Sequence, residues 1–325
     1  MEISYDTLQA GARLFNVDED TLQLLGGMDG VVYAYTRGGR QYVLKFTPAK
    51  RERVPGMRAK LEFVKYLADH GVTVAGPVRS VKGELIELLD APKAATEYAV
   101  SSSERAPGRL AFETGEWGAE LFEEWGRVIG QMHRLTKSYD EQRTWADGLI
   151  GSWEGEHYSF EKSCEDDAVR AKWLALGDEL RGFTPNRDCF GLIHNDLHPF
   201  NFMVSRVNGK LRLTLFDFDV CNYHWFMTDI GIALFHALWA PRPAGLTTTG
   251  FAAGFLESFM RGYYLENQLD AAWLRRLPMF LKYRQILLYM VFIHEWDKPN
   301  LQQKAQLDEW HHNILNDIPV VDLPG

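Results

Sequence analysis

The chain has 325 residues, 46% of them hydrophobic, and its 35 basic and 44 acidic residues give a formal net charge of −9. This length allows two domains around a sizeable core. Because the charge is negative and no block of basic residues occurs, we expect neither a nucleic-acid partner nor an anionic membrane surface. The sequence also lacks the pattern of a signal peptide or of a membrane span.

The cysteines Cys164, Cys189 and Cys221 are widely spaced and form no C-x-x-C pair. Such cysteines are typical of buried thiols in a reducing compartment. We therefore expect a cytoplasmic protein without disulfides. Nothing in the sequence indicates the oligomeric state.

The first hundred residues predict a small, mainly β unit. A short helix over residues 5–16 precedes two strand-like runs, which are joined by a turn that contains Gly27 and Gly30. Lys45 lies in the third strand. Glycines in such a turn let backbone N–H groups approach phosphates, although many glycine-rich hairpins are plain turns. Since the glycines join two strands and do not open a helix, a dinucleotide-binding unit is disfavoured.

The segment that follows predicts the end of this unit. We expect a helix over 57–70, a hairpin over 78–89 and a strand over 97–101. Ser101–Ser103, followed by Pro107-Gly108, has the composition of a linker. We therefore divide the chain into a domain of residues 1–101 and a domain of residues 102–325.

The second domain is predicted to be mainly helical, with helices over residues 118–135, 230–239, 251–264 and 271–294. Asp229 is expected to cap the second of these helices and to brace the segment beside it, which is a structural role. Segment 140–167 is irregular and acidic. It could form a lid for a cationic substrate, or it could be a solvated loop and helix start.

The run from Ile193 to Asp219 carries the most specific pattern. Asp196 precedes Asn201 by five positions, and a hairpin over 202–215 then leads to Asp217. Any one of these residues could merely cap a turn. Together they predict phosphoryl transfer, in which Asp196 takes the proton of a hydroxyl group while Asn201 and Asp217 bind Mg²⁺.

At these positions the chain resembles the aminoglycoside phosphotransferase-like family of small-molecule kinases, whose motif runs close to H-G-D-x-H-x-x-N followed by D-F-D or D-W-D. Here the motif is His194-Asn195-Asp196-Leu197-His198-Pro199-Phe200-Asn201, followed by Asp217-Phe218-Asp219. Asn195 stands where glycine is usual, and Phe200 where glycine is common. The resemblance implies an α+β, bilobal, protein-kinase-like fold with a small β-rich N-lobe and a larger helical C-lobe.

The resemblance also implies an activity. We expect an ATP-dependent phosphotransferase that moves the γ-phosphoryl group to a hydroxyl of a small molecule, such as an aminoglycoside, an amino alcohol or a homoserine-like acceptor. ATP and Mg²⁺ would be its cofactors. Lys45, with backbone at Gly27 and Gly30, would hold the nucleotide phosphates in the N-lobe.

Two roles stay open at this point. In the family a helix glutamate usually pairs with the phosphate-binding lysine, but Lys60 occupies that position here. Either Glu62 reaches Lys45 through a different helix rotation, or other groups hold Lys45. Asp219 could join Asp217 at the metal or could orient the loop.

Two alternative functions also stay open. One is a bacterial Ser/Thr protein kinase of the same fold, although no A-P-E segment of a eukaryotic-type protein kinase follows Asp219. The other is a catalytically silent nucleotide-binding module, which the unusual Lys60 and the incomplete glycine pattern would suit.

Overall fold

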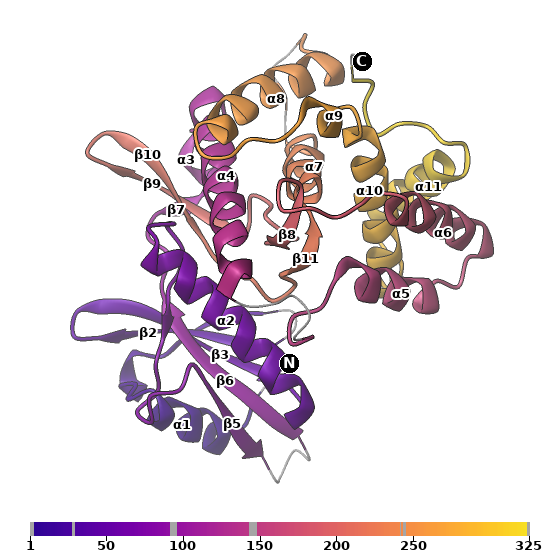
Figure 1. The fold of residues 1–325 in the computed structure, drawn as a ribbon. Helices are drawn as coiled ribbons and strands as arrows, with labels where there is room; N and C mark the ends of the chain where they lie inside the picture. The colour runs from indigo at the N-terminus through magenta and orange to yellow at the C-terminus, as the bar shows by residue number, and fades with distance from the viewer. Residues whose placement is uncertain are drawn as a thin grey trace.

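The computed structural model describes residues 3–27, 30–91, 96–142, 148–240, 242 and 245–323. In these residues the chain forms two lobes, an N-lobe around a six-stranded antiparallel sheet and a larger, mainly helical C-lobe (Figure 1). The bilobal α+β fold predicted from the sequence is confirmed.

The N-lobe sheet has the order β1-β2-β3-β6, and both β4 and β5 pair with β6. Helix α1 (Tyr5–Leu14) contributes to the core under this sheet, where Ala12 and Phe15 cluster with Phe46. Helix α2 (Val54–Asp69) follows β3. The strands are β1 (Gln23–Gly26), β2 (Val31–Arg37), β3 (Arg40–Pro48), β4 (Pro77–Val78), β5 (Ile86–Ala91) and β6 (Thr96–Glu104).

Two predictions for the N-lobe are wrong. The predicted hairpin over 78–89 is replaced by β4 and β5, which both pair with β6. The serine-rich segment predicted as a linker lies in β6, where Ser101 pairs with Lys45 and Ser103 with Val43. Ser102 is buried and its hydroxyl lies 2.8 Å from the hydroxyl of Tyr35. Because β6 is paired along both edges, its ladder bonds outweigh the linker composition, and the sheet continues past residue 101.

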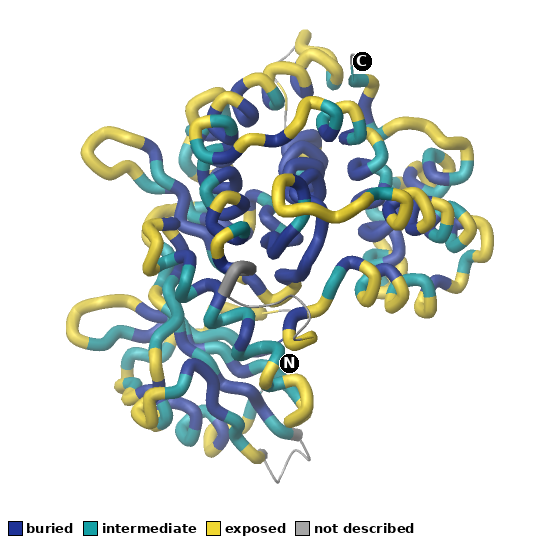
Figure 2. Tube along the Cα trace, in the orientation of Figure 1, coloured by how far each residue is buried: buried dark blue, intermediate teal, exposed yellow. Residues whose placement is uncertain are grey.

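The C-lobe helices pack around a central helix α7 (Phe226–Ala237), which is buried except at His236 and is dark blue over most of its length in Figure 2. The others are α3 (Ala111–Thr114), α4 (Ala119–Gln142), α5 (Trp153–Ser163), α6 (Asp167–Arg181), α8 (Thr248–Tyr264), α9 (Ala271–Leu274), α10 (Leu277–Glu295) and α11 (Leu301–Leu315). The helix predicted over 271–294 is divided into α9 and α10, because Pro278 begins a new helix rather than continuing the first.

Two small sheets carry the loops of the motif. Strands β9 (Phe202–Val207) and β10 (Lys210–Leu215) form the predicted hairpin, and Asn208 and Gly209 both have positive φ in its two-residue turn. Strand β7 (Arg109–Leu110) extends this sheet. Strand β8 (Phe190–Ile193) pairs with β11 (Asn222–Trp225). The ends of β8 and β10 therefore deliver the residues of both motif segments.

The three cysteines are free and buried, as the sequence predicted. Across the ranges that the structure describes, no helix is both long and apolar enough to cross a bilayer.

Candidate active site

A buried aspartate holds the loop that follows β8. Asp229 accepts hydrogen bonds from the backbone N–H groups of His194, at 3.1 Å, and Asn195, at 2.8 Å, and its Oδ2 lies 3.2 Å from Nε2 of His133. Burial would raise the pKa of Asp229, but these partners outweigh burial and hold that pKa below its ordinary value. Asp229 therefore braces the loop as predicted. It does not cap α7, whose N-cap residue is Trp225.

The conformation of this loop explains an unusual residue of the motif. Asn195 has φ of 66°, in the left-handed region where glycine is favoured and asparagine is the best-tolerated alternative. Its side-chain amide donates to Glu156 Oε2 at 2.6 Å and to the carbonyl of Val220 at 3.3 Å. Asn195 thus adopts the backbone conformation of a glycine and adds a hydrogen bond to Glu156 on α5.

Asp196 lies in a shell of donors. Its Oδ1 accepts a hydrogen bond from Nη2 of Arg284, its Oδ2 lies 3.3 Å from His198 Nε2, and Asn201 Nδ2 donates to Oδ2 at 3.2 Å and to the backbone carbonyl at 2.9 Å. Burial by itself would raise the pKa of the Asp196 carboxyl. The positive charge of Arg284 and the hydrogen bond from His198 reverse that effect, so its pKa lies below the ordinary value and the group is ionised.

Arg284 is a site residue that the sequence analysis missed. It lies on α10, is only 7% exposed, and its Nη2 also lies 3.0 Å from Nε2 of His236. The prediction described this helix as apolar-faced, adding bulk to the C-lobe and, by resemblance to the family, part of the acceptor pocket, but it gave Arg284 no role. The sequence carried little signal for it, because Lys282 and Gln285 lie in the same turn and only burial shows that Arg284 needs an acidic partner.

The loop after β10 meets the loop after β8. Phe216 N–H donates to the carbonyl of Asn201 at 3.0 Å, and the Phe216 carbonyl lies 3.0 Å from His194 Nε2. These contacts place Asp217, the next residue, beside the segment that carries Asp196 and Asn201. Asp217 has φ of 66°, a conformation that only aspartate, asparagine and glycine adopt readily.

Lys45 reaches across from β3 to this loop. Its Nζ donates to Asp219 Oδ2 at 2.6 Å and to Asp217 Oδ1 at 3.4 Å. Burial would lower the pKa of Lys45, but the two carboxylates outweigh burial and raise it above its ordinary value. On α2, Lys60 donates to the backbone carbonyl of Asp219. The acidic partners of Lys45 that the structure shows, Asp217 and Asp219, are therefore on the C-lobe loop.

The glycine turn lies next to Lys45. Gly30 precedes Val31, which pairs with Phe46, and a Cβ on Gly30 would lie 2.4 Å from the carbonyl oxygen of Phe46. Gly27 has φ of 131°, which side chains rarely adopt. The turn therefore requires both glycines, and their predicted contact with phosphates stays a prediction. Residues 28–29 lie outside the described residues.

The donors present suit a magnesium ion that is shared with a nucleotide. Within the described part of the chain, no three His, Cys, Asp or Glu side chains form a ready-made metal site. Mg²⁺ usually takes one or two protein oxygens and completes its shell with phosphates and water. Asp217 offers a carboxylate, and Asn201 offers Oδ1 because its Nδ2 is bound to Asp196. The set of Asn201 and Asp217 predicted from the sequence fits such an ion.

Most of the acidic segment supports the plainer of its two interpretations. Asp166 caps α6 by accepting hydrogen bonds from the N–H groups of Ala168 and Val169, and Glu154 is exposed on α5. Glu156 differs, because it points to Asn195 and lies beside the motif. Residues 143–147, which include Asp147, lie outside the described residues.

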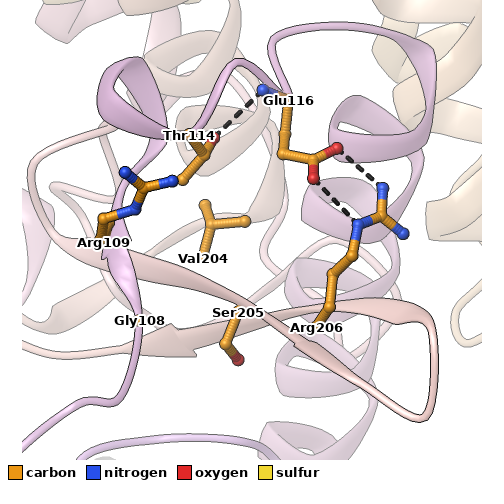
Figure 3. Close-up of a pocket in the computed structure, with 7 residues that line it drawn as sticks. All are labelled: Gly108, Arg109, Thr114, Glu116, Val204, Ser205 and Arg206. Carbon is orange, nitrogen blue, oxygen red and sulfur yellow. Dashed lines mark hydrogen bonds and ion pairs between the residues drawn. The ribbon is translucent and has the colours of Figure 1, made fainter.

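A surface hollow elsewhere contains none of the predicted site residues. It is lined by Gly108, Arg109, Thr114, Glu116, Val204, Ser205 and Arg206 (Figure 3). Arg206 and Glu116 close one side of it through a two-pronged ion pair, with distances of 2.9 and 2.7 Å.

The fold and the site together define a protein-kinase-like phosphotransferase, in which a lysine of the β-rich lobe contacts two aspartates on a loop of the helical lobe. The chain belongs to the phosphotransferase enzyme family, whose sequence model matches residues 20–276.

Two relatives are similar over much of the chain. Amicoumacin kinase of Bacillus subtilis (strain 168) is 32% identical over 322 residues, which cover 96% of this chain and 92% of that protein. Homoserine kinase of Polaromonas naphthalenivorans (strain CJ2) is 28% identical over 244 residues, covering 72% of this chain and 71% of that protein.

Two solved structures of kinases are also similar to this chain. Amicoumacin kinase hAmiN, in complex with AMP-PNP, Ca²⁺ and Ami, superposes with a TM-score of 0.88 at 30% identity, covering 99% of this chain and 96% of that one. A microcompartment-associated aminopropanol kinase shares the fold, with a TM-score of 0.70 at 18% identity over 96% of this chain and 95% of that one. The chain is thus a small-molecule kinase, and the comparisons favour this function over the protein kinase and the silent module.

Proposed function

We propose that the chain transfers the γ-phosphoryl group of ATP, with Mg²⁺, to a hydroxyl of an amicoumacin-like or other amino-alcohol acceptor. The observation that carries the proposal is a series of contacts that links Lys45 to Asp217, the adjacent Phe216 to Asn201, and Asn201 to Asp196. The full-length similarity to amicoumacin kinases supports this choice of acceptor.

Asp196 is the base in this proposal. Its carboxylate is ionised and accepts the hydrogen bond of the acceptor hydroxyl, which orients the hydroxyl oxygen for attack and receives its proton. Arg284, His198 and Asn201 fix the carboxylate in place. They leave it little freedom to turn away from the acceptor.

The nucleotide would be held between the lobes. Asn201 and Asp217 would bind Mg²⁺, which when present neutralises charge on the phosphates. Lys45 and backbone N–H groups at Gly27 and Gly30 would contact the phosphates from the N-lobe. In this division, residues 1–101 with the end of β6 bind the nucleotide, and the rest of the chain to residue 325 carries out catalysis and binds the acceptor.

A screen for ATP consumption tests the proposal. The full chain is incubated with Mg·ATP and, separately, with amicoumacin, 1-amino-2-propanol, homoserine, choline, an aminoglycoside and a generic protein substrate, and ADP release is followed. We expect rapid turnover with at least one small hydroxyl compound and a product that carries one added phosphoryl group. Phosphorylation of the protein substrate alone, or no turnover with any acceptor, would contradict the proposal.

A further inference from the structure

Several buried polar atoms around the motif lack a hydrogen-bond partner among the described residues, and two of them belong to Glu156 and Tyr283. Among the described residues, neither Oε1 of Glu156, on α5, nor the hydroxyl of Tyr283, on α10, has a hydrogen-bond partner, and both atoms are buried. Tyr283 immediately precedes Arg284, whose guanidinium contacts Asp196. Buried polar atoms are nearly always satisfied in folded proteins, so unsatisfied atoms near a site call for a partner, such as a water molecule or a ligand.

Glu156 is held in one orientation. Its Oε2 accepts hydrogen bonds from the side-chain amides of Asn195, at 2.6 Å, and Asn222, at 3.2 Å. Asn195 is the neighbour of Asp196 in the chain and has a fixed left-handed backbone. The two amides occupy one carboxylate oxygen and leave the other available, at a position set by the same loop that carries the base.

The surroundings of Glu156 make it responsive to charge. Burial raises the pKa of Glu156 to about 7, and the negative charge of Asp196 adds to the rise. The hydrogen bond from Asn195 and the positive charges of Arg284 and Lys60 lower the pKa, but they do not offset burial. Burial raises the pKa of Tyr283 well above its ordinary value, and the charge of Glu156 adds to that rise. A cation at Oε1 would favour the ionised carboxylate and would release its proton.

We infer that Glu156 is a specificity-determining residue whose free carboxylate oxygen binds an ammonium group of the acceptor while Asp196 receives the acceptor's hydroxyl. Tyr283 Oη offers a second oxygen to the same ammonium group. This inference rests on the proposed function and narrows its acceptors to amino alcohols in which one molecule spans both carboxylates. Neutral polyols would leave Oε1 of Glu156 without a partner.

The test compares a charged acceptor with its neutral form. The best amine-bearing acceptor of the screen and the same compound after N-acetylation are assayed with the wild-type chain, with Glu156→Gln and with Glu154→Gln. Glutamine keeps an oxygen for Asn195 and Asn222 but removes the charge, and Glu154 is an exposed glutamate on the same helix. Melting temperatures confirm that each variant is folded.

We expect Glu156→Gln to lower kcat/KM for the amine by roughly 10- to 100-fold, the range of a lost charge-assisted hydrogen bond, and to change the acetylated compound little. The KM for ATP should stay the same, and Glu154→Gln should match the wild type. If Glu156→Gln does not fold, Tyr283→Phe replaces it in the test. This variant keeps the ring beside Trp173 and should lower kcat/KM for the amine by about fivefold.

Calorimetry gives an independent readout. When the amine binds to the wild-type chain at pH 7, titrations in two buffers of different ionisation enthalpy should show proton release, because a cation at Oε1 lowers the pKa of Glu156 that burial has raised. Glu156→Gln should release none. A Glu156→Gln chain that binds the amine as tightly as the wild type does would overturn the inference.

Two further outcomes would overturn the inference while leaving the proposed function intact. One is an equal loss for both compounds in Glu156→Gln, and the other is a wild-type chain that uses the acetylated compound as well as the amine. A wild-type chain that phosphorylates nothing contradicts the proposed function instead. In that case titration with 1-amino-2-propanol and with 1,2-propanediol still decides the ammonium site, because it supports the site only if the amine alone binds.

Discussion

At the scale of single residues, the site depends on two opposite effects on the pKa of Asp196. Burial alone would make Asp196 hard to ionise, and the guanidinium of Arg284 reverses that tendency. Arg284 does not touch the reacting atoms in this account, so it is a positioning residue for the base. Sequence patterns located Asp196, Asn201, Asp217 and Lys45 because their spacing in the chain is characteristic. They missed Arg284, and they included Glu156 only as one of several acidic residues in a candidate lid, because only tertiary packing brings α10 and α5 to the motif.

Replacement of Arg284 should change the pH dependence of the reaction. In Arg284→Gln the burial of Asp196 is no longer offset by the guanidinium, so the pKa of Asp196 should rise. A base with a raised pKa is protonated at acidic pH, and the acidic limb of kcat/KM against pH should therefore move to higher pH by about one unit or more.

The matched control for this pH profile is Arg181→Gln, an arginine at the exposed end of α6. It should leave the profile unchanged. A uniform fall in kcat/KM at every pH in Arg284→Gln, with no movement of the acidic limb, would show that Arg284 does not act through the charge of Asp196.

At the scale of secondary structure elements, local signals predicted those elements whose turns fix them. The β9–β10 hairpin was predictable because Asn208 and Gly209 suit its turn and leucines alternate along β10. The serines of β6 misled the prediction, since their strand is held by pairing with β3 on one edge and with β4 and β5 on the other. No local pattern shows pairing between strands that are distant in the sequence.

Close contact between α4 and α8 depends on glycine. A Cβ at Gly262 of α8 would lie 1.8 Å from the carbonyl oxygen of Glu123 on α4. Gly262→Ala should therefore force the helices apart and lower the free energy of unfolding by about 2 to 3 kcal/mol, as overpacking does. Chemical denaturation followed by circular dichroism measures this change.

The same helix provides the control. Gly254 of α8 has nothing within 4 Å of the position of its Cβ. Gly254→Ala should raise the free energy of unfolding by about 0.5 to 1 kcal/mol, the helix propensity gained by replacing glycine. Equal effects of the two substitutions would contradict the account of this interface.

At the scale of the whole molecule, charged side chains of the N-lobe contact a loop of the C-lobe. Lys45 and Lys60 of the N-lobe both bind Asp219 of the C-lobe, one at its carboxylate and one at its backbone carbonyl. The bilobal fold followed from the motif's resemblance to a family, and the comparisons confirm that family. The contacts of Lys60 did not follow, because its position in the family holds an acidic residue.

The central claim is that Asp196 is the base of a phosphoryl transfer. Its most direct test is the single-turnover rate of Asp196→Asn with Mg·ATP and the acceptor found by the screen. Asp178→Asn, an exposed aspartate on α6, is the control. We expect a fall of roughly 100-fold or more in the rate of phosphoryl transfer, the usual contribution of a positioned base, with ATP affinity and melting temperature close to those of the wild type. An Asp196→Asn chain that transfers the phosphoryl group at the wild-type rate would contradict the account.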